Sequence, residues 1–343
     1  MIDDTKFQAG ELVEVLSKEE ILRTLDDKGQ LDNLPFMPQM FQYCGQRLRV
    51  FKRAHKTCDT VNRPAGRRMD SAVHLEGIRC DGQAYGGCQT GCMIFWKNAW
   101  LKKVAQHGET NNGHAPVSTA SSAEVDEAKV WKGTKVPAAD AEAEPTYVCQ
   151  TTQLPVATGE LSTWDIRQYL EDYSSGNVNL RELLNGFVYA TYNNTLNLGI
   201  GIGPIMRWFY DLFQRLRGGV PYPRRWGKIA IGQPTPTGKL DLKPGELVRV
   251  KSYEDILKTV DTSNKNRGLY FDAEMVPFCG GTYRVRARVE RMVNEKTGKM
   301  IKMKNDCIIL ENVFCRACYS EERHFCPRAI YSYWREIWLE RVT

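Results

Sequence analysis

The sequence has no long apolar run, because nowhere among its 343 residues do eighteen apolar side chains follow one another. A membrane-spanning helix is therefore not expected, since crossing the hydrocarbon core takes about 20 apolar residues. The N-terminus, Met1–Asp4, is acidic and no apolar segment follows it, so it does not predict a secretory signal peptide. We therefore expect a cytoplasmic protein.

The common nucleotide-binding and nucleophile motifs are also missing. There is no glycine-rich phosphate loop, no dinucleotide fingerprint and no Gly-x-Ser-x-Gly nucleophile turn. Apolar residues make up 42% and charged residues 26% of the chain, which is ordinary for a globular protein. The net charge of +6 is mild, and it leaves nucleic acid, anionic lipid and acidic ligands open as partners.

The chain contains one cysteine-bearing segment twice. With an offset of 235 residues, the two copies align without a gap over about 70 residues. After a three-residue insertion the alignment resumes. Aligned pairs include Gly10 with Gly245, Cys44 with Cys279, Cys80 with Cys315, Cys88 with Cys326, and Trp100 with Trp338. Ten of the eleven cysteines lie inside the copies, which predicts two related domains.

The predicted fold class is α+β. Each copy contains short alternating strands and one helix, a pattern typical of a small β-rich domain such as a partly open, SH3-like barrel. The stretch between the copies begins with a segment rich in Ala, Ser, Glu and Pro, which predicts a flexible linker. The predicted parts are a first cysteine-rich domain (1–105), the linker (106–146), a helical insert (147–240) and a second cysteine-rich domain (241–343).

Local signals recur in both copies. Ser17 and Ser252 each precede an acidic residue by three positions, which predicts a capped helix. The segment 294–298 predicts a hairpin turn in the second copy. Near the end of each copy, aromatic residues at helical spacing (95–101 and 331–339) predict a helix whose rings cover the core, with stacking on a base or ligand as the alternative.

Cysteine is plentiful, and without secretion eleven thiols favour metal binding over a disulfide framework. Four thiolates fit either a tetrahedral zinc site or a cubane 4Fe–4S cluster, and the sequence does not decide between these cofactors. We predict two metal centres. Their candidate ligands are Cys58, Cys80, Cys88 and Cys92 in the first copy, and Cys307, Cys315, Cys318 and Cys326 in the second.

Two further points concern these cysteines. The second set is similar to the cluster loop of the DNA glycosylases related to endonuclease III, but two of its three gaps differ, and the resemblance implies no function. Cys44 and Cys279 are additional candidate ligands, the alternative being small buried side chains beside a turn glycine. The glycine-rich segment 81–92 is expected to direct backbone N–H groups at sulfur.

Three residues are candidates for catalysis. His74 and Glu76 are expected to face the same side of a strand, and only Glu76 has an acidic counterpart in the second copy, Glu311. We predict that the pair orients a metal ligand or transfers protons, with a surface pair as the alternative. Cys149, which lies outside both copies, is a candidate nucleophile or a structural thiol.

The segment 205–228 is the most basic and aromatic part of the chain. A surface for nucleic acid or an acidic ligand, and an interfacial membrane helix, are two interpretations. We expect the third, a helix packed into the core with solvated arginines.

The sequence from His74 to Gly82, together with Gly87-Cys88-Gln89 and the segment 95–101, resembles that of an uncharacterised family of bacterial proteins. This resemblance implies no activity. The residues themselves predict a two-repeat metalloprotein. It is either a metalloenzyme or redox partner of a biosynthetic pathway, with the first repeat active, or a non-catalytic nucleic-acid-binding or scaffold protein with structural zinc.

Overall fold

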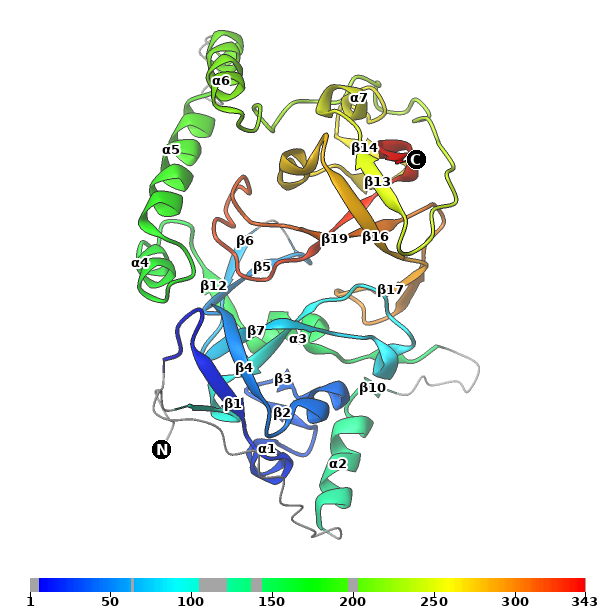
Figure 1. Cartoon of the computed structure of the whole chain (residues 1–343). Helices are drawn as coiled ribbons and strands as arrows, with labels where there is room; N and C mark the ends of the chain where they lie inside the picture. The colour runs from blue at the N-terminus through cyan, green and yellow to red at the C-terminus, as the bar shows by residue number, and fades with distance from the viewer. Residues whose placement is uncertain (1–5, 63–64, 105–121, 137–143, 197–202, 343) are drawn as a thin grey trace. The chain divides into compact units, whose positions relative to one another are not determined.

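The computed structural model describes residues 6–62, 65–104, 122–136, 144–196 and 203–342, and the fold is mixed α+β (Figure 1). The chain divides into two compact units. Unit 1 comprises Met1–Asn179, Met292–Ile301 and Cys326–Arg328, and unit 2 comprises Leu180–Arg291, Lys302–Phe325 and Ala329–Thr343. Each unit has its own hydrophobic core.

Each unit is built on a five-stranded antiparallel sheet of half-barrel shape. In unit 1 the strands are β1 (Leu12–Val15), β4 (Arg47–Arg53), β7 (Ala72–Arg79), β8 (Met93–Lys97) and β9 (Leu101–Lys103), in the order β8-β7-β4-β1-β9. In unit 2 they are β13 (Leu247–Val250), β16 (Thr282–Arg288), β19 (Ile308–Phe314), β20 (Tyr331–Trp334) and β21 (Leu339–Arg341), in the order β20-β19-β16-β13-β21. The two orders are the same.

The strand registers also coincide. Leu12 pairs with Arg49 in the first sheet, and at the same offset Leu247 pairs with Arg284 in the second. A β-bulge follows Val50 in β4 and the equivalent Val285 in β16. The internal repeat predicted from the sequence is therefore a repeat of structure.

The connections within each repeat match as well. Between the first two sheet strands, each repeat has a short α-helix, a small hairpin and a 3-10 helix. In the first repeat these elements are α1 (Lys18–Thr24), β2 (Gln30–Leu31), β3 (Leu34–Pro35) and η1 (Pro38–Tyr43). Their equivalents in the second repeat are α7 (Tyr253–Leu257), β14 (Lys265–Asn266), β15 (Leu269–Tyr270) and η4 (Ala273–Phe278). Ser17 and Ser252 cap their helices as predicted, each accepting a hydrogen bond from the backbone N–H three residues on.

The predicted aromatic helices do not form. Residues 95–101 lie in β8, the 3-10 turn η3 (Asn98–Trp100) and β9, and 331–339 form β20, η5 (Glu336–Trp338) and β21. All five residues of β8 are buried, so the strand shows no alternation that a sequence pattern can reveal. The role expected of the rings is correct, because Trp96, Trp100, Trp334 and Trp338 are fully buried in the two cores.

The units differ from the predicted domain ranges. Residues 147–179, predicted as part of the insert, belong to unit 1, and so do two short segments of the second repeat. The predicted linker contains α2 (Ser122–Lys132), whose Val130 is buried in the first core. Among the described side chains of α2, only Val130 is deeply buried, so the segment has no amphipathic pattern that would indicate a helix. Its composition alone therefore predicted a linker. Residues 105–121 and 137–143 lie outside the described residues.

The remaining elements surround these sheets. In unit 1 they are β5 (Lys56–Asp59), β6 (Ala65–Arg68), β10 (Lys135–Val136), β11 (Thr146–Tyr147), α3 (Gln150–Ala157), β12 (Gly159–Leu161) and α4 (Arg167–Ser174). The helices α5 (Leu180–Leu196) and α6 (Gly203–Arg217) follow, and β17 (Arg291–Val293) and β18 (Met300–Lys302) form the hairpin predicted around 294–298. No helix in the described part of the chain is long and apolar enough to cross a membrane.

Candidate metal centre

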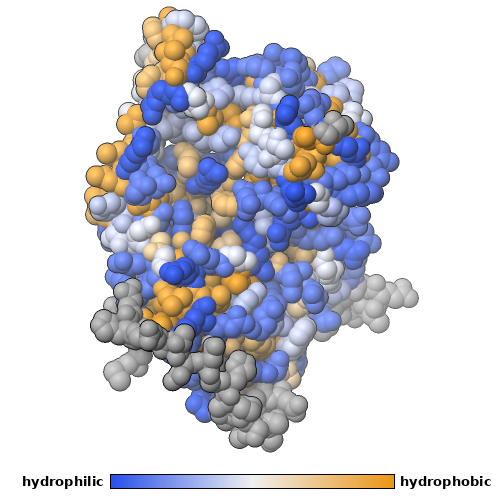
Figure 2. Space-filling view, in the orientation of Figure 1, coloured by the Kyte–Doolittle hydropathy of each residue, from blue (hydrophilic) through white to orange (hydrophobic). Residues whose placement is uncertain are grey.

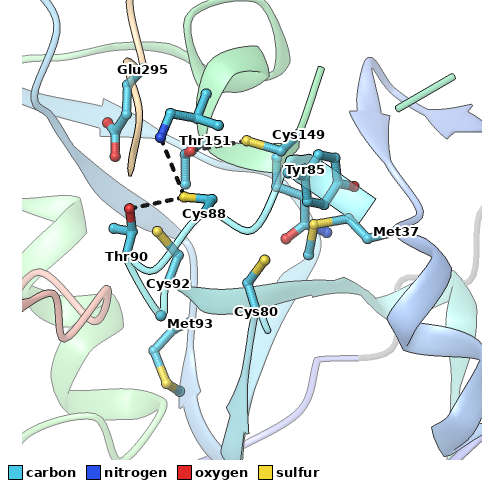
Figure 3. Close-up of a pocket in the computed structure, with 13 residues that line it drawn as sticks. Met37, Cys80, Tyr85, Cys88, Thr90, Cys92, Met93, Cys149, Thr151 and Glu295 are labelled. Carbon is cyan, nitrogen blue, oxygen red and sulfur yellow. Dashed lines mark hydrogen bonds between the residues drawn. The ribbon is translucent and has the colours of Figure 1, made fainter. Parts of the chain in front are cut away.

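Four cysteines line one cavity in unit 1: Cys80, Cys88, Cys92 and Cys149 (Figure 3). The cavity measures about 30 Å³, which exceeds what one water molecule requires. The remaining lining residues are Met37, Tyr85, Thr90, Gly91, Met93, Gln150, Thr151, Val293 and Glu295. Sulfur and apolar atoms therefore dominate the wall of the cavity.

The loop between β7 and β8 carries three of the four cysteines. It folds back on itself, with the N–H of Cys80 donating to the carbonyl oxygen of Cys92 at 2.8 Å. Gly82 has a φ of +71°, and a Cβ atom there would lie 1.8 Å from the carbonyl oxygen of Cys88. Only glycine fits at this position, so the loop depends on it to bring its cysteines together.

Cys149 reaches the cavity as the N-cap residue of α3. The next residue, Gln150, is buried, and its side chain donates to the carbonyl oxygen of Phe95 at 2.8 Å and accepts from the N–H of the same residue at 2.8 Å. A further bond joins it to the carbonyl oxygen of Pro35. This buried amide fixes the start of α3 against β8 and so positions Cys149.

The sequence does not predict that Cys149 lies with the other three, because the residue is outside the repeat that defines the ligand sets. The sequence predicts Cys58 in its place. Cys58 is buried in β5, and its sulfur lies 3.9 Å from Nη1 of Arg328; it does not line the cavity.

Hydrogen-bond partners surround three of the four sulfur atoms. Val293 donates its backbone N–H and Gln39 its side-chain amide, and two threonine hydroxyl groups lie at hydrogen-bond distance, where either the hydroxyl or the thiol can donate. The contacts are Gln39 Nε2 to Cys80 Sγ (3.2 Å), Val293 N to Cys88 Sγ (3.3 Å), Thr90 Oγ1 with Cys88 Sγ (3.2 Å) and Thr151 Oγ1 with Cys149 Sγ (3.2 Å). Such contacts stabilise negative charge on sulfur and are common around metal-bound thiolates.

Burial dominates the titration of these thiols. It raises the pKa of Cys80 to about 12, and it raises the pKa of Cys92 and Cys149 as well. Neighbouring cysteines raise these values further, whereas the Arg328 guanidinium acts in the opposite direction on Cys92. Each of these three thiols therefore keeps its proton at neutral pH unless a cation displaces it.

Two segments of the second repeat belong to the same unit and border this site. Val293 and Glu295 line the cavity, and Arg328 is almost fully buried beside them. Nη2 of Arg328 lies 2.5 Å from one carboxylate oxygen of Glu295, and the other oxygen accepts from the Thr60 hydroxyl. The first repeat thus supplies three of the cysteines, the N-cap residue of α3 is the fourth, and the second repeat supplies part of the wall.

The four sulfur atoms surround a space rather than a point (Figure 3). Within the described residues, no three Cys, His, Asp or Glu side chains lie close enough together to hold one metal ion. Tetrahedral zinc at about 2.3 Å from each sulfur would require the sulfurs to approach to roughly 3.8 Å.

The cysteines of the second repeat differ in their exposure. Cys307, immediately before β19, is fully buried, Cys318 is exposed, and Cys315, immediately after β19, is partly buried. Burial raises the pKa of Cys307 to about 12. Cys326 belongs to unit 1 and the other three to unit 2. The predicted second centre stays a prediction.

Cys44 and Cys279 occupy equivalent positions at the ends of η1 and η4. Each is partly buried against its own core, and burial raises the pKa of Cys44 to about 11 and that of Cys279 to about 12. Neither lines the cavity. Their position beside a turn glycine agrees with the alternative of a packed, small side chain.

His74 and Glu76 do not share a surface. His74 is fully buried, with Nδ1 donating to the carbonyl oxygen of Ile94 at 2.9 Å, whereas Glu76 is exposed. The register of β7 shifts between His74 and Arg79, with Gly77 at φ +72° between them, which breaks the expected alternation. Burial lowers the pKa of His74 to about 4, so the ring is neutral. Neither residue lines the cavity.

Unit 1 contains a buried charged cluster that the sequence does not predict. Lys56 Nζ lies 2.5 Å from Asp172, and His55 Nε2 lies 3.2 Å from the same carboxylate. All three side chains are nearly or fully buried. The cluster joins β5 to α4. Asp172 is more than 100 residues from the other two members, so no local sequence pattern indicates the cluster.

The helix predicted within 205–228 forms as α6, but it is not a core helix, because it has no buried residue. Part of the basic charge expected over 205–228 is neutralised. Arg225 pairs with Asp211 and Glu254, and Arg224 pairs with Glu321.

No protein-family model matches this chain, and no curated protein is significantly similar to it.

Proposed function

We propose that this protein is an iron–sulfur protein, with a 4Fe–4S cluster bound by Cys80, Cys88, Cys92 and Cys149. The single observation that supports the proposal is the convergence of these four thiols on one cavity, although Cys149 lies outside the repeat. When bound, such a cluster, with a cysteine on each iron, supplies one-electron transfer.

The arrangement of the sulfurs favours a cluster over a single zinc ion. A cubane spreads its four thiolate ligands apart because each binds a different iron. A zinc site needs its ligands around one point, and no such grouping occurs among the described residues. The apolar wall and the hydrogen bonds to sulfur are features that tune cluster potentials.

The chain's own residues then have distinct roles. Gln39, Val293 and the two threonines at the cavity donate hydrogen bonds to thiolate sulfur. Arg328 places a buried positive charge near Cys92, where it offsets part of the negative charge of a thiolate-bound cluster. We propose a role as a metalloenzyme or redox partner in which the first repeat is the active one.

A finer part of the proposal concerns the fold of the repeats. The strand order, the long connection after the first strand and the 3-10 turn before the last strand support an SH3-like barrel in each repeat. A second metal centre at Cys307, Cys315, Cys318 and Cys326 would require these thiols to come together on metal binding.

Anaerobic purification of the full chain, followed by iron and sulfide analysis and a visible spectrum, tests the proposal. We expect roughly four iron and four sulfide ions per bound cluster, with broad visible absorption. Cys149→Ser should lose most of both. Zinc alone, or no metal, in the anaerobic wild-type protein would overturn the assignment.

Cys58→Ser is the matched control. Its thiol is buried in the same unit and was equally eligible from the sequence, but it does not line the cavity. This variant should keep its iron. If Cys58→Ser loses the cluster and Cys149→Ser retains it, the ligand set proposed here is wrong.

The alternative, a nucleic-acid-binding or scaffold protein with structural zinc, has less support. The pairing of Arg224 and Arg225 with carboxylates leaves less positive charge for phosphate over 205–228. A zinc-only preparation that binds oligonucleotides at low salt would favour it.

A further inference from the structure

The helix α6 turns its apolar face to solvent. Its large apolar residues recur at intervals of three and four, which places them on one stripe. Each is between 38% and 79% exposed: Ile205, Trp208, Phe209, Leu212, Phe213 and Leu216. Figure 2 shows hydrophobic residues gathered over α5 and α6.

The polar face of α6 is the one that contacts its own unit. Tyr210 packs on Tyr192 of α5 with ring centroids 5.3 Å apart, and Asp211 accepts a hydrogen bond from the N–H of Tyr222 at 2.8 Å. The Tyr192 hydroxyl also donates to the carbonyl oxygen of Met206. The helix is therefore inverted relative to an ordinary surface helix, whose apolar stripe faces the core.

Positive charge borders this stripe. At helical spacing, Arg215 and Arg217 fall on its two edges, and both are exposed. The Arg217 guanidinium lies 5.0 Å from the centre of the Phe213 ring. Asp211, the one acidic residue of α6, is already paired with Arg225. The exposed face of the helix thus combines aromatic rings with unneutralised arginines.

We propose that α6 binds the surface of an anionic lipid membrane, with the apolar stripe among the acyl chains and Arg215 and Arg217 at the phosphate groups. Large apolar and aromatic residues flanked by arginine are the composition of interfacial helices. A second copy of the chain fits less well, because stripe-to-stripe packing would bring like-charged edges together. A nucleic-acid duplex would leave the apolar stripe in water. The exposed Leu184, Phe187 and Val188 of α5 extend the apolar surface.

Cosedimentation of the full chain with vesicles tests this proposal. The wild-type protein should bind vesicles that contain phosphatidylglycerol more tightly than vesicles of phosphatidylcholine alone. Because Trp208 and Phe213 are each more than half exposed, the double variant W208S/F213S should keep its fold. Its vesicle affinity should fall at least about tenfold, because two rings no longer enter the membrane. Trp164→Ser, which removes a tryptophan that is 86% exposed in unit 1, is the matched control and should bind as wild type.

A second variant separates charge from apolar contact. R215Q/R217Q should lose the preference for phosphatidylglycerol, and its binding should depend less on salt. Failure of the wild-type protein to bind either vesicle would overturn the proposal. So would a wild-type dimer, seen by sedimentation velocity, that W208S/F213S converts to monomer, because the stripe would then be a contact between copies.

Discussion

The two repeats have the same strand order, the same register and the same bulge, yet their cysteines differ: Cys80, Cys88 and Cys92 of the first line a cavity, whereas Cys318 of the second is exposed. The difference lies in their connections. In the first repeat, the loop after β7 supplies three cysteines, and α3, which follows the repeat, supplies a fourth. The sheet is therefore a common scaffold, and the loops attached to it determine whether cysteines come together on it.

One pair of equivalent residues shows how the repeats diverged. Gln39 in η1 donates its side-chain amide to the sulfur of Cys80. The residue at the same offset in η4 is Glu274, which is buried and accepts from the N–H of Tyr319 and the hydroxyl of Ser320. The same position thus faces a thiol in one repeat and fixes a loop in the other.

The largest expected effect tests whether the two cores are equivalent. Trp100 and Trp338 are fully buried, and each donates its indole N–H to an equivalent threonine, Thr24 or Thr259. Replacing either tryptophan by alanine should lower the free energy of unfolding by about 3–5 kcal/mol. Urea unfolding measures both. A cost confined to one of them would mean that the repeats share a shape but not a comparable core.

The next prediction concerns a difference between the repeats. Lys56 is buried against Asp172, whereas the residue at the same offset, Arg291, is exposed. Lys56→Met should cost about 3–5 kcal/mol, because it leaves a buried carboxylate without its lysine partner. Arg291→Met, the matched control, should change stability by no more than about 0.5 kcal/mol.

A double variant sharpens this second test. Replacing Asp172 by Leu in the Lys56→Met background removes the uncompensated charge, so part of the lost stability should return. If Lys56→Met costs no more than Arg291→Met in urea unfolding, the buried pair contributes little and the contrast between the units fails.

A smaller effect distinguishes the second repeat by its response to acid. Burial raises the pKa of Glu336. Hydrogen bonds from three backbone N–H groups and the charge of Arg288 lower it by more, so the pKa lies below its usual range. The N–H donors belong to Leu240, Asp241 and Leu242. A depressed pKa stabilises the fold above the ordinary glutamate pKa, and this contribution is lost as the pH falls through the folded-state value.

Glu336→Gln should therefore lower stability by about 1–3 kcal/mol at neutral pH. The gap between variant and wild type should shrink as the pH is taken below about 4. The equivalent residue of the first repeat is Asn98, and Asn98→Ala should show no such pH dependence. Thermal unfolding at a series of pH values measures both; a gap that widens in acid would contradict the prediction.

The smallest expected effect concerns Cys318, which is exposed in unit 2. Cys318→Ser should change stability by no more than about 0.5 kcal/mol and should leave the iron content of the anaerobic protein unchanged. A loss of iron, or a large drop in melting temperature, would show that the second repeat also holds metal.

Much of the fold was predictable from the sequence, because the repeat, the serine caps and the turn at 294–298 depend on neighbouring residues. The aromatic segments were misassigned because β8 is buried throughout and has no alternation. In the candidate site, Cys80, Cys88 and Cys92 were predicted together because they share a short loop, and all three line the cavity, whereas Cys149 joins them through the buried contacts of Gln150. The long-range residues Glu295 and Arg328 carried no local signal at all.

The participation of 292–301 and 326–328 in unit 1 has a consequence for biosynthesis of the protein. A ribosome makes the chain from its N-terminus, at about 5–20 residues per second. All four cysteines of the cavity have been translated once Cys149 is complete, but Val293, Glu295 and Arg328 follow only after most of the second repeat. The thiols of the nascent first half therefore stay uncovered by the second repeat for many seconds. A protein that delivers metal would reach them most easily during this interval.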